Sequence, residues 1–265
     1  MSGPWKRASP ARGAGGGQQR RDELRVHGVN AVREVFARRP QALRKLYLTQ
    51  SRLSGFADVM RWCAANRIGY RIVEDDDLRR LAASSHHEGV VADVLREPVE
   101  PLSEWLAALP DGPCCLLWLD GVGNPHNLGA ILRSAAHFGV AALLVPDSGE
   151  LQLSGAAARV AEGGAEHVRL VALSDNGRSD LAALRAAGFT TAATLVSGGD
   201  ELFAASLPAR LVYVMGEEQS GMDRGLAAAC DLRLSIPGSG AVESLNVAAA
   251  TAVFLAAWAA AVQAA

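Results

Sequence analysis

Three polar, glycine-containing loops carry the residues of this chain that could do chemistry. The first, residues 120–129, reads DGVGNPHNLG and leads into an apolar helical stretch that contains Arg133. The second, residues 216–221, reads GEEQSG, and the third, residues 236–246, reads IPGSGAVESLN. Glycine lets a ligand approach the backbone closely, and amide, hydroxyl and guanidinium groups can bind a polar substrate. The pattern favours a binding site for a polar ligand.

Each loop taken alone also has a plainer structural interpretation. Asn127 is suited to cap the following helix, and a single Arg in an apolar helix most often forms a salt bridge. The acids of the second loop could cap a helix, bind a cation or accept hydrogen bonds from a substrate. The third loop could be a tight turn before a capped helix. Neither glycine-rich loop fits a dinucleotide fingerprint, because Pro125 interrupts the first and the third lies too near the C-terminus, so hydride transfer is disfavoured.

The elements around these loops predict an α/β fold. Six apolar segments are expected to be strands: Cys114–Leu119, Val140–Val145, Val168–Ala172, Thr191–Val196, Leu211–Met215 and Leu232–Ile236. Helical stretches lie between or after them: Leu128–Phe138, Ser154–Ala161, Asp180–Ala187, Gly225–Ala229 and Val247–Val262. Near-continuous apolar strands separated by helices predict a parallel sheet covered on both faces. Ligands bind such sheets outside the carboxyl ends of the strands, where the three loops fall.

A smaller α/β unit is predicted before this sheet. Its expected helices are Val29–Arg38, Phe56–Asn66 and Asp75–Ala83, and its expected strands are Leu43–Leu48, Tyr70–Val73 and Gly89–Leu95. The proline-rich stretch that follows is typical of a linker. The sequence therefore predicts a flexible basic arm at 1–21, a small domain at 22–96, a linker at 97–113 and a larger domain at 114–265.

Charge is distributed unevenly along the chain. The 265 residues include 26 Lys+Arg and 28 Asp+Glu, a net charge of -2 that argues against a generally basic nucleic-acid-binding protein. Residues 1–21, however, hold five basic residues and no acid, which leaves a net charge of -7 for the remainder. The arm is either a solvated leader or an RNA-binding segment.

Cysteine usage and hydropathy exclude several classes of protein. The four cysteines form no disulfide framework and no zinc spacing, and the adjacent Cys114 and Cys115 should point to opposite faces of a strand. His86-His87-Glu88 is too compact to supply several ligands to one metal, so structural or substrate-contacting histidines and no metal are expected. Val247–Val262 is too short and too Ala-rich to span a membrane, and the N-terminus has no apolar signal core. We expect a cytoplasmic protein with no membrane partner.

Taken together, the three loops resemble a known family. PHNLGAILRSAAHFG, GEEQSG and IPGSGAVESLNVAAA, in this order and spacing, resemble the three signature motifs of the SpoU/TrmH branch of the SPOUT RNA methyltransferases, over residues 114–262. RVHGVNAV at 25–32 and HHEGVV at 86–91 resemble the small, ribosomal-protein-like RNA-substrate-binding domain of that branch. Within the branch the chain is most similar to the YfiF-like tRNA/rRNA methyltransferases and next to the RlmB-type enzymes.

The resemblance implies an activity, a fold and a set of residue roles. It implies methyl transfer from S-adenosyl-L-methionine to a ribose 2′-hydroxyl of tRNA or rRNA, with no role for DNA, by a homodimer with a trefoil knot in the C-terminal domain. The catalytic roles fall on Asn127, Arg133, Glu218, Ser244 and Asn246. The cofactor would be held largely by backbone at Gly216, Ile236 and Leu245. The chain departs from the family pattern at Gln219, where Gly is usual, and at Ala248, where Ser is usual.

The expected chemistry suits these residue types. A guanidinium has a pKa above about 12, so Arg133 is better suited to stabilise a developing alkoxide than to act as a general base. Asn127, Ser244 and Asn246 would position the ribose and the RNA backbone. One alternative is a non-catalytic RNA-binding or ribosome-assembly protein that retains the fold, and a more distant one is an S-adenosylmethionine-dependent enzyme acting on protein or small molecules.

Overall fold

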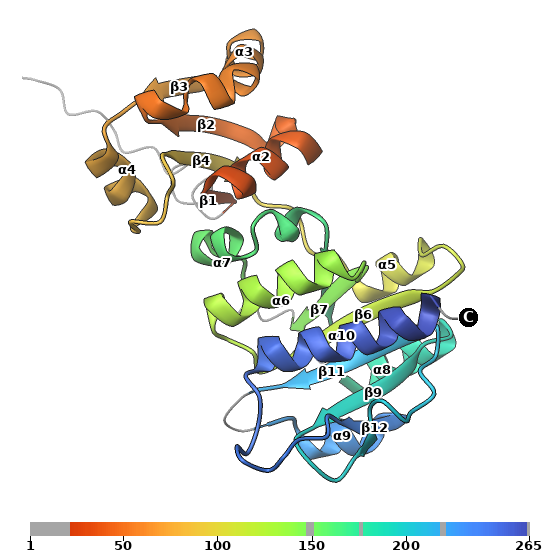
Figure 1. The fold of residues 1–265 in the computed structure, drawn as a ribbon. Helices are drawn as coiled ribbons and strands as arrows, with labels where there is room; N and C mark the ends of the chain where they lie inside the picture. The colour runs from red at the N-terminus through yellow and green to blue at the C-terminus, as the bar shows by residue number, and fades with distance from the viewer. Residues whose placement is uncertain (1–21, 147–150, 175–176, 218–220, 264–265) are drawn as a thin grey trace, which may run out of the picture.

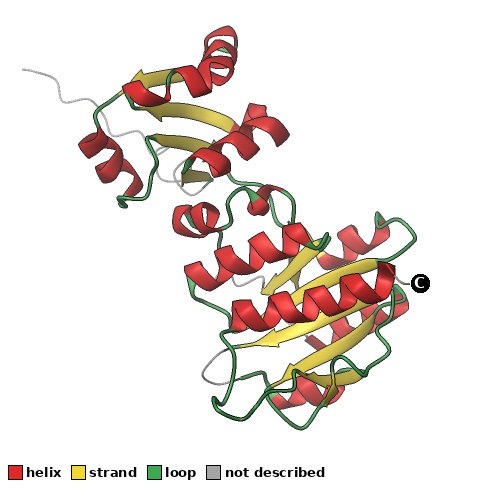
Figure 2. Cartoon of the chain, in the orientation of Figure 1, coloured by secondary structure: helices red, strands yellow, loops and turns green. Residues whose placement is uncertain are grey.

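The computed structural model describes residues 22–146, 151–174, 177–217 and 221–263, so the basic arm lies outside the described residues. It holds a four-stranded sheet near the N-terminus and an eight-stranded sheet after it (Figures 1 and 2). Every pairing in the eight-stranded sheet is parallel. The predicted α/β class and parallel sheet are therefore confirmed, whereas the trefoil knot stays a prediction of the family resemblance.

The small sheet is mixed. Its strands stand in the order β1 (Glu23–His27), β4 (Val90–Leu95), β2 (Leu43–Leu48) and β3 (Gly69–Ile72). Strand β4 runs antiparallel to both β1 and β2, and β3 runs parallel to β2. The helices are α2 (Val29–Arg38), α3 (Ala57–Ala65) and α4 (Asp75–Ala82), with short 3₁₀ turns η1 (Pro40–Ala42), η2 (Gln50–Arg52) and η3 (Ser54–Phe56).

Successive side chains of β2 pack against helices on opposite faces of the small sheet. Leu46 and Leu48 are fully buried in a core that includes residues of α2 and α3, such as Val35 and Val59. Tyr47, between the two leucines, points the other way and packs with Leu78 of α4. Because successive strand side chains point to opposite faces, one apolar strand supports a helix layer on each side.

The large sheet stands in the order β10 (Asp200–Glu201), β12 (Leu232–Ser235), β9 (Thr190–Leu195), β11 (Arg210–Gly216), β6 (Cys114–Asp120), β7 (Ala142–Pro146), β8 (Arg169–Leu173) and β5 (Glu100–Pro101). On one face lie α6 (Pro125–His137), α7 (Gly155–Val160) and α10 (Val247–Gln263), and on the other α5 (Leu102–Ala107), α8 (Gly177–Ala186) and α9 (Arg224–Ala229). Helices α6 and α10 lie side by side (Figure 1). Cys115 packs in the first of these cores and Cys114 in the second, as their adjacency predicts.

The structure corrects several details. Helix α6 begins at Pro125, and its N-cap is Asn124, whose side chain accepts a 2.9 Å hydrogen bond from the His126 N–H. The prediction that Asn127 caps this helix is wrong, because proline at the first helical position starts the helix three residues earlier. Within the stretch predicted as a linker, β5 pairs with β8 and Leu102 of α5 is buried, so residues 100–107 pack against the large sheet. No helix among the described residues is long and apolar enough to cross a membrane.

Candidate functional site

A pocket of about 300 Å³ opens at the carboxyl ends of β9, β11 and β12, next to the first turns of α10. Its walls come from residues 194–196, from residues 215–217 and 221–222, and from residues 236–240 and 242–245, together with Val247, Ala250 and Phe254 of α10. This is the edge of a parallel sheet at which ligands bind. The second and third polar loops of the sequence therefore meet here.

The pocket has apolar walls that solvent reaches. Val242 is 71% exposed, Val196 is 61% exposed and Leu245 is 46% exposed, and all three line the pocket. Large apolar side chains are seldom left in water as a group unless a ligand or another protein covers them. An apolar wall beside backbone polar groups suits a ligand with a flat aromatic part and polar edges.

Gly216 provides a close backbone approach at the floor of the pocket. A Cβ at this position would lie 2.5 Å from the Met222 backbone nitrogen, so no larger residue fits there. Beyond it, Glu217 and Gly221 are joined by two backbone hydrogen bonds, of 3.2 and 3.0 Å. These contacts place Gly221 and Met222 directly beside the end of β11, where both line the pocket.

Asn246 joins the third loop to the first. Its Oδ1 accepts hydrogen bonds from the N–H groups of Ala248, at 3.0 Å, and Ala249, at 3.3 Å, so it caps helix α10. Its Nδ2 donates to Oδ1 of Asn127 at 3.1 Å. The two asparagines that the resemblance assigns to catalysis are therefore in direct contact, although 119 positions separate them in the chain.

The first loop also touches the second. The Asp120 carboxylate accepts a 3.0 Å hydrogen bond from the Asp223 N–H. Gly121 has a φ of +80°, and a Cβ on it would lie 3.2 Å from Cβ of Glu217. All three polar loops therefore converge at one edge of the sheet.

Arg133 lies apart from this pocket. It is exposed on α6, six residues beyond Asn127, which in an α-helix is about 9 Å further along the axis and roughly 240° around it. Its backbone packs against the 3₁₀ turn η4 (Gly164–Glu166), since a Cβ on Gly164 would lie 3.0 Å from Cα of Arg133. Within one copy of the chain, Arg133 therefore does not line the pocket.

The remaining predicted site residues divide into two groups. Gly216, Ile236, Ser244 and Leu245 all line the pocket. Glu218, and with it the departure at Gln219, lies outside the described residues. Ala248, the other departure, is buried in the core beneath α10 and does not line the pocket.

Sequence reasoning missed the wall that the end of β9 provides. Thr194, Leu195 and Val196 line the pocket, and the Thr194 hydroxyl donates a 2.8 Å hydrogen bond to the Val214 carbonyl. The strand was predicted, but the polar stretch that follows it, Ser197-Gly198-Gly199-Asp200, was not singled out. The signal available was the position of its carboxyl end beside that of β11.

The histidine cluster of the small domain has structural contacts. Nδ1 of buried His87 accepts a 3.1 Å hydrogen bond from the Gly89 N–H, and the His86 carbonyl accepts one from Nε of Arg159 at 3.0 Å. No group of three or more His, Cys, Asp or Glu residues among the described residues is arranged to hold a metal ion.

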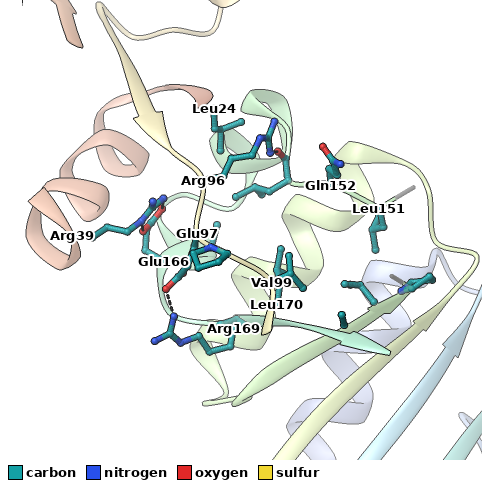
Figure 3. Close-up of a pocket in the computed structure, with 17 residues that line it drawn as sticks. Leu24, Arg39, Arg96, Glu97, Val99, Leu151, Gln152, Glu166, Arg169 and Leu170 are labelled. Atoms are coloured by element: carbon teal, nitrogen blue, oxygen red, sulfur yellow. Dashed lines mark hydrogen bonds and ion pairs between the residues drawn. The ribbon is translucent and has the colours of Figure 1, made fainter. Parts of the chain in front are cut away.

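A second cavity, of about 200 Å³, lies where the small sheet meets the large one (Figure 3). Arg39, Arg96, Glu166 and Arg169 line it, together with apolar side chains of residues 151–153 and 168–172. Nη1 of Arg96 donates a 2.7 Å hydrogen bond to the Leu153 carbonyl, and Arg169 pairs with Glu97. None of the residues of the three polar loops lines this cavity, so it is not the candidate site.

Comparison with known families matches nearly all of the chain after the arm. Residues 115–256 match the SpoU rRNA Methylase family. Residues 25–98 match a family described as RNA 2′-O ribose methyltransferase substrate binding.

Individual relatives agree. The chain is 39% identical over 241 residues to the uncharacterized tRNA/rRNA methyltransferase YfiF of Escherichia coli O157:H7, covering 91% of this chain and 69% of the relative. It is 37% identical over 236 residues to the 23S rRNA (guanosine-2′-O-)-methyltransferase RlmB of Pseudomonas aeruginosa, covering 87% and 94%.

Solved structures show the same fold. A TrmH-family RNA methyltransferase structure from Porphyromonas gingivalis has a TM-score of 0.70 and 28% identity over 91% of each chain. The methyltransferase AviRb of Streptomyces viridochromogenes, solved with AdoMet, has a TM-score of 0.76 and 23% identity over 96% of each chain.

Proposed function

Because the chain belongs to the SpoU rRNA methylase family, we propose that it transfers a methyl group from S-adenosyl-L-methionine to a ribose 2′-hydroxyl of tRNA or rRNA in the cytoplasm. The observation that carries this proposal is the convergence of the three polar loops, with Asn127 hydrogen-bonded to Asn246 beside the pocket. Similarity over both halves of the chain to enzymes that modify ribose supports it.

The pocket residues fit the cofactor. The close approach at Gly216 would let backbone groups bind the polar edges of S-adenosylmethionine, with Ile236 and Leu245 against its flat part. The Glu217 and Glu243 carboxylates line the pocket and would favour a cationic ligand. S-adenosylmethionine supplies an electrophilic methyl group on a sulfonium.

The protein's own task is to prepare the ribose hydroxyl. That hydroxyl is almost un-ionised at neutral pH, so negative charge on its oxygen must be stabilised as the new O–C bond forms. Arg133 would supply this stabilisation and bind the adjacent phosphate, and the hydroxyl proton would pass to phosphate or water. Asn127, Asn246 and Ser244 would hold the ribose in line with the methyl group.

We further propose that the enzyme is a homodimer. Within one chain Arg133 does not line the pocket, so a second copy would have to bring its Arg133 to this site. Helix α10 exposes Ala249, Ala256 and Ala260 beside α6, and small side chains permit close helix approach. The exposed Val242 would also be covered by such a partner.

We propose that RNA binds at the start of strands β2 and β3. Three arginines of the small domain are held by acids: Arg33 by Asp58, Arg38 by Glu34 and Arg39 by Glu166. Arg44 and Lys45 form no ion pair among the described residues, and Lys45 pairs in register with Gly69, next to Arg67 and Arg71. Asp22, to which the basic arm is joined, lies at the same end, because its carbonyl accepts a hydrogen bond from the Arg96 N–H at the end of β4.

The test combines cofactor binding with methyl transfer. Calorimetry should show that wild type and Arg133→Lys bind S-adenosylmethionine equally. Transfer of labelled methyl groups to total RNA should be strong for wild type and much weaker for Arg133→Lys, and the modified linkages should resist alkaline cleavage, as 2′-O-methylation requires. Cofactor binding without transfer to any RNA would instead favour the non-catalytic RNA-binding protein. Comparing 2′-O-methyl sites in cells with and without the gene would identify the nucleotide.

A further inference from the structure

Strand β3 stands at the outer edge of the small sheet, beside α3 (Figure 1). One side of its backbone pairs with residues 45–48 of β2, and no described residue pairs with the other side. All four residues of β3 are exposed, whereas three of the four β2 residues opposite them are buried. Proteins usually protect such an unpaired edge with charged or polar side chains.

Two of the four β3 residues are nevertheless large and apolar. Tyr70 is 42% exposed and Ile72 is 52% exposed. In register they stand opposite Leu46 and Leu48, so they belong to the face of the sheet that α2 and α3 cover. The two leucines are fully buried there, but the side chains at the edge remain in contact with water. An aromatic ring beside an aliphatic side chain on an unpaired strand indicates a surface that a partner covers.

Arginines without a counter-ion flank this apolar pair. Arg71 lies between Tyr70 and Ile72 in the strand, and Arg67 lies two residues before the strand begins. Both arginines are exposed, and neither guanidinium forms a hydrogen bond or an ion pair within the described part of the chain. Arg61, on the helix that contacts β3, is exposed and unpaired in the same sense.

The acids nearest to β3 are at its other end. Asp75, Asp76 and Asp77 begin helix α4, and all three pair with Arg79 or Arg80 of the same helix. The positive charge without a partner is therefore concentrated where β3 begins, next to Tyr70.

An RNA with an unpaired base fits both features of this surface. Its phosphates are attracted to guanidinium groups that have no other anion to bind, and the flat face of a base can stack on an aromatic ring. A base inside a duplex has no free face, because its neighbours stack on it, and double-stranded RNA is recognised mainly through its backbone. The surface of β3 therefore suits a loop or a bulge better than a continuous duplex.

We propose that Tyr70 is a specificity-determining residue whose ring stacks on an unpaired base of the RNA substrate. Arg67 and Arg71 bind the phosphates on either side of that base, and Ile72 extends the apolar surface beneath it. The inference deepens the RNA-binding surface proposed at the start of β2 and β3, and it rests on the proposal that the substrate is RNA.

The central experiment measures binding of two labelled RNAs to the full chain by fluorescence anisotropy. One RNA is a hairpin with an unpaired loop, and the other is a fully paired duplex of the same base composition. Wild type should bind the hairpin more tightly. Tyr70→Leu, which keeps an apolar side chain but removes the ring, should weaken hairpin binding by about tenfold, the scale of one base–aromatic stack, and leave duplex binding unchanged. Tyr70→Phe, which keeps the ring, should match wild type.

Arg71→Gln is the matched control, because it removes a charge from the adjacent position. It should weaken binding of both RNAs alike and lower the salt dependence of binding, whereas Tyr70→Leu should leave the salt dependence unchanged. In methyl transfer, Tyr70→Leu should raise KM for RNA and keep kcat, since a stack on the small domain holds the RNA equally in the ground state and the transition state. Circular dichroism should show the wild-type spectrum for every variant.

Several outcomes would contradict this role for Tyr70. The inference is wrong if Tyr70→Leu binds the hairpin as tightly as wild type, or if wild type binds hairpin and duplex equally. A changed oligomeric state of Tyr70→Leu in analytical ultracentrifugation, with RNA binding intact, would show instead that β3 contacts another copy of the chain. A wild type that binds the hairpin through Tyr70 but transfers no methyl group would overturn the proposed enzymatic function and leave this inference standing.

Discussion

The Arg39–Glu166 ion pair should be the most costly single contact to break at the junction of the two domains. Only 13% of the Arg39 side chain and 6% of the Glu166 side chain are exposed. Two short hydrogen bonds join the two charges, and Nη1 of Arg39 also donates to the Leu95 carbonyl at 2.5 Å. The hydrogen bond to Glu166 raises the pKa of Arg39, against the opposing effect of burial.

The substitution Arg39→Ala would leave the Glu166 carboxylate almost fully buried and without its cation. Removing one partner of a buried pair costs about 3–5 kcal/mol, much of it for the charge left behind. Arg169→Gln is the matched control, because its pair with Glu97 spans the same junction but is 60% and 40% exposed. An exposed pair contributes less than about 1 kcal/mol.

The measurement is urea unfolding followed by tryptophan fluorescence and far-UV circular dichroism. Trp62 reports on the small domain and Trp118 on the large one, so loss of coupling between the domains should appear as separated transitions. Replacing both members of the pair, as Arg39→Met with Glu166→Met, should restore much of the stability, since no unpaired charge remains. The reasoning fails if Arg39→Ala is no more destabilising than Arg169→Gln, or if the double variant is worse than Arg39→Ala.

Three further outcomes are expected. Burial raises the pKa of Asp231, but hydrogen bonds from Thr191 and Arg185 outweigh it, so the net shift is downward. The stability that the Asp231 carboxylate contributes is therefore present at neutral pH and is lost as the pH falls through its folded-state pKa. Asp231→Asn should lower the free energy of unfolding by about 1–3 kcal/mol at pH 7, and urea unfolding at a series of pH values should show a weaker loss of stability in acid than for wild type. Gly216→Ala should abolish S-adenosylmethionine binding in calorimetry while circular dichroism keeps the wild-type spectrum, because the added methyl group displaces the loop at the pocket. The Tyr213 hydroxyl is buried with no hydrogen-bond partner among the described residues, so Tyr213→Phe should leave thermal stability equal or raise it by about 1 kcal/mol.

Elements with a clear periodic pattern could be predicted from the sequence almost to the residue. Helix α2 and strand β2 have the bounds that were expected, because each buries a regular set of apolar side chains. Strand β1 was missed, since ELRVH carries charges at alternate positions and forms a strand only because β4 pairs with it. Strand β5 has two residues and exists only through β8, so no local pattern could indicate it.

The candidate site was predictable in its composition but not in its geometry. The loop motifs identified Asn127 and Asn246, yet only the fold brings them to 3.1 Å. The same is true of the charges at the end of α2. Arg38 and Arg39 are adjacent basic residues in the sequence, but Arg38 pairs with Glu34, one turn earlier, and Arg39 pairs with Glu166 of the other domain. Contacts between distant segments decide which charges remain available, and a sequence pattern does not contain them.

The partition of charge follows from the two tasks of the molecule. Residues 97–265 hold 8 Lys+Arg and 18 Asp+Glu, a net charge of -10, whereas residues 22–96 hold 13 and 10. An acidic catalytic half attracts a cationic cofactor but repels a phosphate backbone at distances near the Debye length. On charge alone, the small domain is therefore better suited than the large one to attract RNA. The two halves are joined by contacts too short for salt to screen, such as the 2.5 Å pair between Arg39 and Glu166, so RNA held by the small domain is held at a fixed place relative to the large one.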